Sequence, residues 1–169
     1  MTVLLLARHG ETVDNVNRIM QGQTQGELTA NGVLQAKNLG LQLKSDDIDV
    51  IVSSDLRRSY DTAMIIAEIL NKDVTKTTLL RERDWGGFTG RYIPDIQNET
   101  WPDDIETLEA LQGRARKFLD YISTTYHDKC VLAVGHGIIN KAIQAVFYNK
   151  PMKDVERMTN AEVRKLVIE

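Results

Sequence analysis

The stretch Val3-Leu4-Leu5-Leu6-Ala7-Arg8-His9-Gly10 decides the fold of this chain. Its apolar run predicts a buried strand, and the glycine that closes the stretch predicts a turn directly after it. Arg8 and His9 would then lie at the carboxyl edge of a sheet, where open α/β sheets bind their ligands. The planar guanidinium of Arg8 matches phosphate or carboxylate geometry, so the stretch favours an anionic ligand.

The length of the chain indicates a single domain, residues 1–169, that is large enough for a genuine core. With 21 basic and 24 acidic residues the chain is mildly acidic, and it has no basic block, so we expect neither a nucleic acid nor a membrane as partner. The lone cysteine, Cys130, excludes an internal disulfide and favours a reducing compartment. The apolar start is too short to span a bilayer. We therefore expect a soluble, cytoplasmic protein; no feature predicts an oligomeric state.

Strand and helix patterns alternate along the chain. Strands are expected at 3–7, 48–53, 74–78, 130–134 and 163–168, and helices at 29–45, 55–71, 104–126, directly after 137, and briefly after Pro151. The first two strand–helix–strand units predict a parallel sheet with right-handed crossovers. The fold class is therefore α/β, a three-layer α/β/α sandwich with a mostly parallel central sheet. Two segments break the pattern: a long polar loop over 8–28, and residues 80–103, which we expect to lie over one end of the sheet.

Four stretches carry chemistry that could converge. They are Arg8-His9-Gly10, Ser53 to Ser59, Leu80 to Gly87, and Val134-Gly135-His136-Gly137. Three of them follow predicted strands, and the carboxyl ends of parallel strands lie at one edge. The assembled set would hold two imidazoles, two or three guanidiniums and one carboxylate, which suits phosphoryl transfer. Arg8 and Arg58 could neutralise a phosphate without a metal, and no cofactor is expected.

Each feature also has a purely structural interpretation. Glycines around His136 suit a tight strand-to-helix turn, Arg57 and Arg58 could form a solvated pair, and Glu82 could belong to a surface ion-pair cluster. A neutral imidazole is a competent nucleophile near pH 7, and Glu82 can act as a general acid if its surroundings keep it protonated. The three histidines lack the close spacing of a zinc site.

Four motifs together resemble the histidine phosphatase superfamily, in its phosphoglycerate mutase-like branch, and most closely its compact cofactor-independent phosphatases. They occur in the family's order over nearly the whole chain. The matching residues are Arg8 to Thr12 with Asn15, Gln21-Gly22, Leu28-Thr29, Gly32 and Gln35-Ala36; then Ser54, Leu56, Arg58, Thr62 and Ala63; then Leu80, Glu82, Gly86 and Gly90; and finally Gly135-His136-Gly137, with Asn160 before the last strand.

The resemblance implies a role for each matching residue. His9 would become phosphohistidine, and Glu82 would give a proton to the leaving group. Arg8, Arg58 and His136 would cradle the phosphate, and the substrate contacts would come from Asn15, Gln21, Gly22, Arg83, Trp85 and Gly137. The side chains expected to set substrate identity are Gln21, Gln23, Arg83, Trp85, Phe88 and Trp101.

The basic residues of the cap insert, at about 83–112, help to choose among three possible functions. Between Gly90 and Gln112 only Arg91 is basic, whereas mutases of the family use a longer, more basic insert to hold a substrate carboxylate. The expected function is therefore a metal-independent phosphatase that hydrolyses phosphate monoesters through phospho-His9. The alternatives are a bisphosphoglycerate-dependent phosphoglycerate mutase and a non-catalytic phosphate-binding regulatory module. A small-molecule ester is the expected substrate, with a phosphoprotein as the second substrate class.

Overall fold

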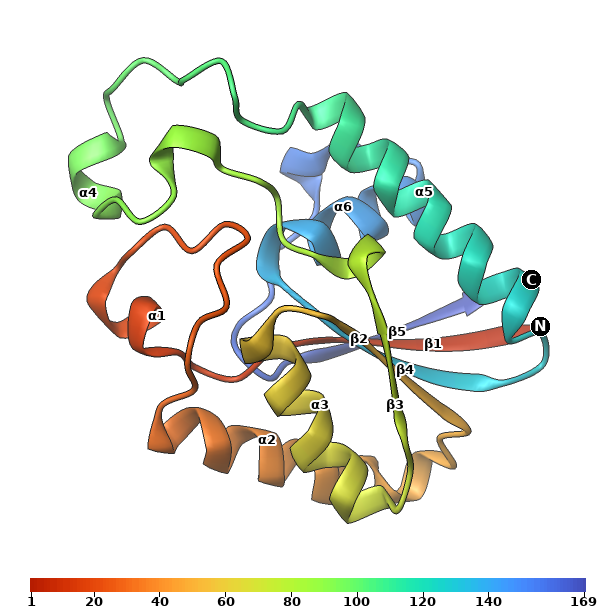
Figure 1. Ribbon diagram of the computed structural model, residues 1–169. Coiled ribbons are helices and arrows are strands. Elements are labelled where there is room, and N and C mark those ends of the chain that lie inside the picture. Colours follow the sequence, from red (N-terminus) through yellow and green to blue (C-terminus); the bar gives the residue numbers. More distant parts are fainter.

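The computed structural model describes residues 1–169 as a five-stranded sheet with helices on both faces (Figure 1). The strands are β1 (Thr2–Arg8), β2 (Val50–Ser54), β3 (Val74–Thr77), β4 (Cys130–Gly135) and β5 (Val163–Ile168). The helices are α1 (Val13–Asn17), α2 (Ala30–Gln42), α3 (Arg57–Leu70), α4 (Ile93–Ile96), α5 (Leu108–Thr125) and α6 (Gly137–Tyr148). The sheet order is β3-β2-β4-β1-β5, and only β5 runs antiparallel to its neighbour.

Alternate residues of β1 face opposite helical layers, which is why its apolar run is continuous. Leu4 and Leu6 pack with the core residues of α5 and α6, whereas Leu5 and Ala7 pack with those of α2 and α3. Successive side chains of a strand point to opposite faces of the sheet, so a strand between two helical layers needs apolar residues at every position. The predicted three-layer α/β/α sandwich is confirmed (Figure 1).

The order of the strands differs from the simplest reading of two successive crossover units. The unit β2–α3–β3 joins neighbouring parallel strands. The unit before it does not, because β4 lies between β1 and β2 and pairs with both. The end of β4, and the histidine that follows it, therefore lie directly beside the end of β1.

Two predicted helices have different bounds in the structure. The expected helix 29–45 starts after the predicted cap, since Thr29 Oγ1 accepts a hydrogen bond from the N–H of Gly32, but it ends at Gln42 and continues as a 3-10 helix to Asp46. The helix expected from 104 starts only at Leu108, with Thr107 as its cap. The spacing of Ile105 in the sequence fits the apolar face of the expected helix, but its side chain packs with Phe88 and Ile96 instead.

The two irregular segments lie together beyond the carboxyl ends of the parallel strands, where Figure 1 shows α1 and α4. The loop over 8–28 contains α1, which Thr12 and Asn15 close with a capping box. Backbone hydrogen bonds join this loop to the later segment, from Met20 N–H to Arg91 C=O and from Gly90 N–H to Met20 C=O. The prediction that residues 80–103 cover one end of the sheet is confirmed.

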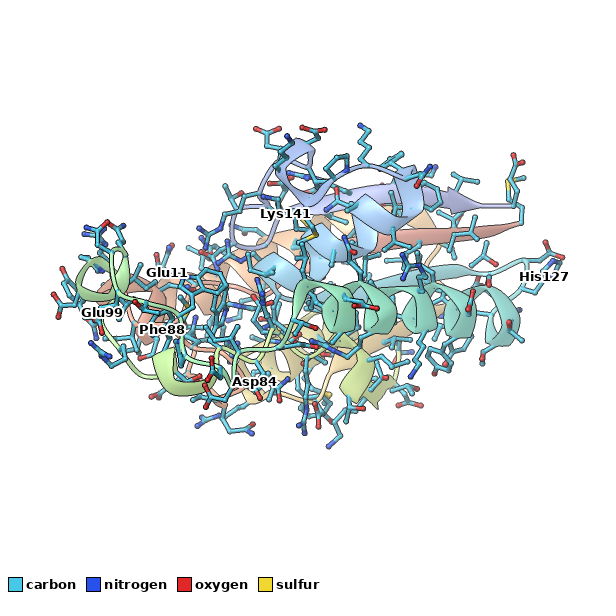
Figure 2. All side chains as sticks on the ribbon, turned by 90° about the horizontal axis from the view of Figure 1, so that it is seen from above. Glu11, Asp84, Phe88, Glu99, His127 and Lys141 are labelled. Carbon is cyan, nitrogen blue, oxygen red and sulfur yellow. The ribbon has the colours of Figure 1, made fainter.

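None of the helices combines the length with the apolar content that crossing a bilayer would require. Figure 2 looks down onto α5 and α6 and separates the two ends of the molecule: Glu11, Phe88 and Glu99 lie at one end and His127 at the other. His127 is exposed and pairs with Asp128 at 3.0 Å. This places the third histidine far from the other two.

Candidate active site

A cavity of about 190 Å³ opens where β1 ends. Its lining consists of Arg8, His9, Asn15, Ile19, Met20, Gln21, Gly22, Arg58, Glu82, Trp85, Ile93, Ile138 and Arg157. Residues from three of the four sequence motifs line it directly, and the fourth lies against them through His136. The parallel strand ends therefore bring the predicted motifs together.

Arg8 and His9 form the floor of the cavity at the end of β1. Arg8 is buried, and one of its terminal nitrogens donates to the carbonyl of Met158 at 2.7 Å. Burial, with a smaller contribution from the positive charge of Arg157, lowers the pKa of Arg8. The Nδ1 of His9 lies 2.7 Å from the carbonyl oxygen of Gly10. A carbonyl can only accept, so Nδ1 carries the proton and Nε2 keeps its lone pair.

Arg58 reaches the cavity from the first turn of α3, and its side chain is 1% exposed. Its terminal nitrogens donate to the carbonyl of Gly22, at 2.8 Å, and to that of Thr24. Burial lowers the pKa of Arg58 to about 10, which still leaves it positively charged at neutral pH. The neighbouring Arg57 instead pairs with Asp61 on the surface and does not line the cavity.

His136 follows β4 and meets His9 edge to face, with 5.1 Å between the ring centroids. Its Nε2 lies 2.9 Å from Oγ of Ser54, and that oxygen also accepts the N–H of Leu56. The hydroxyl proton of Ser54 can then be satisfied only by donation to Nε2, which leaves the imidazole proton on Nδ1. Burial, together with the charge of Arg58, lowers the pKa of His136 well below its usual value.

Glu82 caps the first turn of α6 from outside the helix. Oε1 accepts the N–H groups of Arg83 and Ile139, at 2.8 and 2.9 Å, and Oε2 accepts that of Ile138 at 3.0 Å. The positive end of a helix dipole and free N–H donors both attract a carboxylate. A side chain that could have been a surface ion-pair residue is therefore fixed inside the cavity.

Arg114 on α5 holds the backbone that carries Glu82. It donates to the carbonyls of Leu79, Arg81 and Glu82, and it pairs with Glu106 at 2.8 Å. Three carbonyl acceptors on one segment fix its path past the start of α6. Nothing in the sequence motifs indicated this residue, because these three carbonyls lie more than 30 positions away.

Two amide side chains, those of Asn15 and Gln21, also line the cavity, and a third, that of Asn160, lies against Asn15. Asn160 donates through Nδ2 to the carbonyl of His9 and to Oδ1 of Asn15, both at 3.2 Å. Since Oδ1 of Asn15 also accepts the N–H of Thr12, its NH₂ group is the part left without a protein partner. Gln21 accepts the hydroxyl of Thr12 at 3.0 Å.

Three predicted site residues lie outside the direct lining. His136 lies behind His9, and Gly137 lies under Arg8, where a Cβ atom would be 3.5 Å from Nε of that arginine. Arg83 is not in the cavity: its guanidinium lies over the rings of Trp85 and Trp101, at 4.8 and 5.4 Å, and donates to the carbonyl of Glu106. Trp85 itself does line the cavity.

The sequence interpretation missed five lining residues, Ile19, Met20, Ile93, Ile138 and Arg157. Ile19, Met20 and Ile93 come from the two irregular segments, and Ile138 from the first turn of α6. Arg157 comes from the segment before β5, which carries no motif. The antiparallel return of β5 is the only signal that could have placed it at this edge of the sheet.

No group of three or more His, Cys, Asp or Glu residues is placed to hold a metal ion. The charged groups that line the cavity are Arg8, Arg58, Arg157 and Glu82. Three cations and one carboxylate give an electropositive cavity with buried donors. This arrangement can bind a small anion and place it beside the free lone pair of His9.

Comparison with known proteins agrees with this chemistry. Residues 4–169 match the model of the histidine phosphatase superfamily (branch 1). The uncharacterized phosphatase PhoE of Bacillus subtilis is 35% identical over 95% of this chain and 86% of its own length. The probable phosphoglycerate mutase GpmB of Proteus mirabilis is 36% identical over 82% and 71%. A mycobacterial glucosyl-3-phosphoglycerate phosphatase, solved in complex with VO3, has a TM-score of 0.91 at 29% identity and covers 98% of this chain and 92% of its own.

Proposed function

This chain belongs to the histidine phosphatase superfamily and is a phosphatase, and from that premise we propose how its cavity hydrolyses small phosphate monoesters: through a phosphohistidine on His9, without a metal ion.

Three buried nitrogen donors that have no protein partner carry this proposal. They are Nε of Arg8, Nε of Arg58 and Nδ1 of His136. Buried donors in folded proteins are nearly always hydrogen-bonded, so three unpaired ones around one cavity call for an acceptor with several oxygens. A phosphoryl group provides three such oxygens and the negative charge that two arginines would balance.

His9 has the protonation state that a nucleophile needs. Burial is the main reason that its pKa lies well below the usual value, and the charges of Arg58 and Arg8 lower it further. The ring is therefore neutral at pH 7, and the bond from Nδ1 to Gly10 leaves the lone pair on Nε2. A neutral imidazole of fixed tautomer is ready to attack phosphorus.

The reaction proceeds in two balanced steps. Nε2 of His9 forms a bond to phosphorus while the ester P–O bond breaks, and the leaving oxygen takes a proton from Glu82. Water then attacks the phosphohistidine, Glu82 accepts the water's proton, the P–N bond breaks, and inorganic phosphate leaves. Oε2 of Glu82 accepts only one N–H group and so keeps a lone pair for the proton.

The size of the cavity favours a small ester over a phosphoprotein. A volume of about 190 Å³ is below the roughly 300–1,000 Å³ of pockets that enclose drug-sized ligands. Residues at both ends of the sequence, from Arg8 to Arg157, form its wall. This supports the reading of 1–169 as one catalytic domain, with the cap expected at 83–112 over the cavity. The lone cysteine supports a cytoplasmic location.

The mutase reading has less support from the site. Arg91, the one basic residue between Gly90 and Gln112, pairs with Glu99 at 2.6 Å and does not line the cavity. A non-catalytic binding module would also need the cavity. It would need neither the free lone pair of His9 nor the hydrogen-bonded carboxyl of Glu82.

Turnover of an aryl phosphate by the wild type, His9→Ala and His127→Ala tests the proposal. We expect turnover in EDTA, a loss of several orders of magnitude in His9→Ala, and no loss in His127→Ala. Rapid acid-free quenching should also trap a phosphoramidate signal by ³¹P NMR in the wild type only. Appreciable activity in His9→Ala, or activity that EDTA abolishes, would sink the mechanism. Formation of 2-phosphoglycerate from 3-phosphoglycerate faster than phosphate release would favour the mutase instead.

A further inference from the structure

Arg157 is the one arginine of the cavity that the phosphatase mechanism does not use. It lies in the segment before β5 and is exposed, and its side chain forms no hydrogen bond or ion pair within the protein. The arginines that do pair with carboxylates lie away from the cavity lining; they are Arg57, Arg81, Arg91, Arg114 and Arg164. An arginine without a carboxylate partner, at the mouth of an anion-binding cavity, is available to a ligand.

The fold fixes Arg157 beside another cation. A Cβ atom on Gly137 would lie 3.5 Å from Nε of Arg8 and 3.9 Å from Nε of Arg157, so both guanidiniums contact the same point above the start of α6. Burial of Val155 and Met158 anchors the backbone on both sides of Arg157, and the carbonyl of Met158 accepts from Arg8. Two like charges held together by the backbone lose their repulsion when an anion binds between or beside them.

Arg157 differs in exposure from the side chains that would bind the phosphate. Arg8, Arg58 and His136 are 8%, 1% and 0% exposed, and each has a buried nitrogen without a protein partner. Arg157 also lines the cavity but is exposed, so it lies nearer to the solvent, and the alcohol part of an ester whose phosphate is bound by the buried donors would extend toward the solvent. Two buried arginines already match the two charges of a phosphate monoester. The third positive charge is therefore left for another part of the substrate.

We propose that Arg157 binds a carboxylate on the alcohol part of the substrate, so that the enzyme prefers small phosphate esters of hydroxy acids. The proposal rests on the phosphatase function given above. It differs from the expectation for mutases, because the cation comes from the segment before β5 and not from the cap. A guanidinium can bind a carboxylate through two parallel hydrogen bonds, which gives geometric as well as charge selectivity.

Matched esters test the assignment. Phosphoglycolate and ethyl phosphate differ by a carboxylate in place of a methyl group, and each is assayed with the wild type, Arg157→Gln, Arg157→Lys and Lys153→Gln. Lys153 is an exposed cation of the same segment that does not line the cavity. We expect Arg157→Gln to raise KM for phosphoglycolate roughly 10- to 100-fold and to leave ethyl phosphate within about twofold. Arg157→Lys should recover part of the loss, and Lys153→Gln should behave as wild type.

Two results would overturn the proposal. An equal rise of KM for both esters would assign Arg157 to the phosphate, and no change for either would show that it contacts no part of the substrate. Calorimetric binding of phosphoglycolate to His9→Ala and to the double variant with Arg157→Gln gives the same comparison without turnover. A wild type that hydrolyses neither ester contradicts the phosphatase mechanism, while the calorimetry still decides the role of Arg157.

Discussion

The rings of His9 and His136 meet edge to face, with 62° between their planes and 5.1 Å between their centroids. Each ring is buried among cations, and burial is the main cause that lowers the pKa of both histidines well below 6.5. One ring presents a lone pair on Nε2, and the other presents a proton on Nδ1. The same burial therefore supports a nucleophile and a neutral hydrogen-bond donor side by side.

The pH dependence of stability follows from this pair. The unfolded chain protonates its histidines near pH 6.5, whereas the folded protein keeps His9 and His136 neutral far below that. The unfolded state thus binds more protons, so the free energy of unfolding is fully retained above about pH 6.5 and decreases as pH falls below it. Each histidine contributes about 1.4 kcal/mol per pH unit in that window. Urea unfolding between pH 7.5 and 5 measures the slope.

The variant that tests this slope is His136→Gln. It removes one of the two buried histidines, so about half of the slope should be lost. A wild-type slope no steeper than that of His136→Gln would contradict the burial argument.

In Ser54→Ala, the ring of His136 should no longer be held in a single tautomer. Without the hydroxyl that donates to Nε2, the proton is no longer held on Nδ1, and we expect kcat/KM to fall roughly tenfold. The ¹⁵N shifts of the ring report the tautomer directly. Ser53→Ala is the matched control, since that buried hydroxyl bonds to Ser54 C=O and Ser59 and not to a histidine. Unaltered ¹⁵N shifts in Ser54→Ala would refute the assignment.

Arg114→Gln should impair proton donation by Glu82. The segment from Leu79 to Glu82 loses its shared donor, so we expect kcat to fall roughly 10- to 100-fold for an alkyl phosphate. The fall should be much smaller for p-nitrophenyl phosphate, whose leaving group needs no proton. Arg116→Gln, an exposed cation of the same helix, should change neither rate. Equal losses for both esters would show that Arg114 acts on general stability alone.

Gly32→Ala and Gly113→Ala should change stability in opposite directions, although both lie in helices. A Cβ on Gly32 would overlap the carbonyl of Glu11, so we expect a loss of about 1–3 kcal/mol. A Cβ on Gly113 meets no atom within 4 Å, and the higher helix propensity of alanine should add roughly 0.5–1 kcal/mol. Urea midpoints compare the two, and a shift of the same sign in both would contradict this packing.

Local patterns in the sequence predicted the parts of the molecule that depend on neighbours in the chain. The apolar run of β1, the cap at Thr29 and the motif arginine Arg58 all carry a local signal and lie where it placed them. Contacts between distant segments carry no such signal. The position of β4 inside the sheet, the packing of Ile105 away from α5 and the approach of Arg157 all depend on distant pairings that no periodicity encodes.

The pairing of β1 also determines when the active site can form during synthesis. Strand β1 pairs only with β4 and β5, the last two strands in sequence order, so its backbone has no strand partner until they have been made. Met158 and Asn160, which hold Arg8 and His9, are separated from them by 150 and 151 positions. A nascent chain therefore carries His9 but cannot hold it in the active site until Asn160 has been translated. Throughout that time Leu4, Leu5 and Leu6 form an unpaired strand that is open to aggregation.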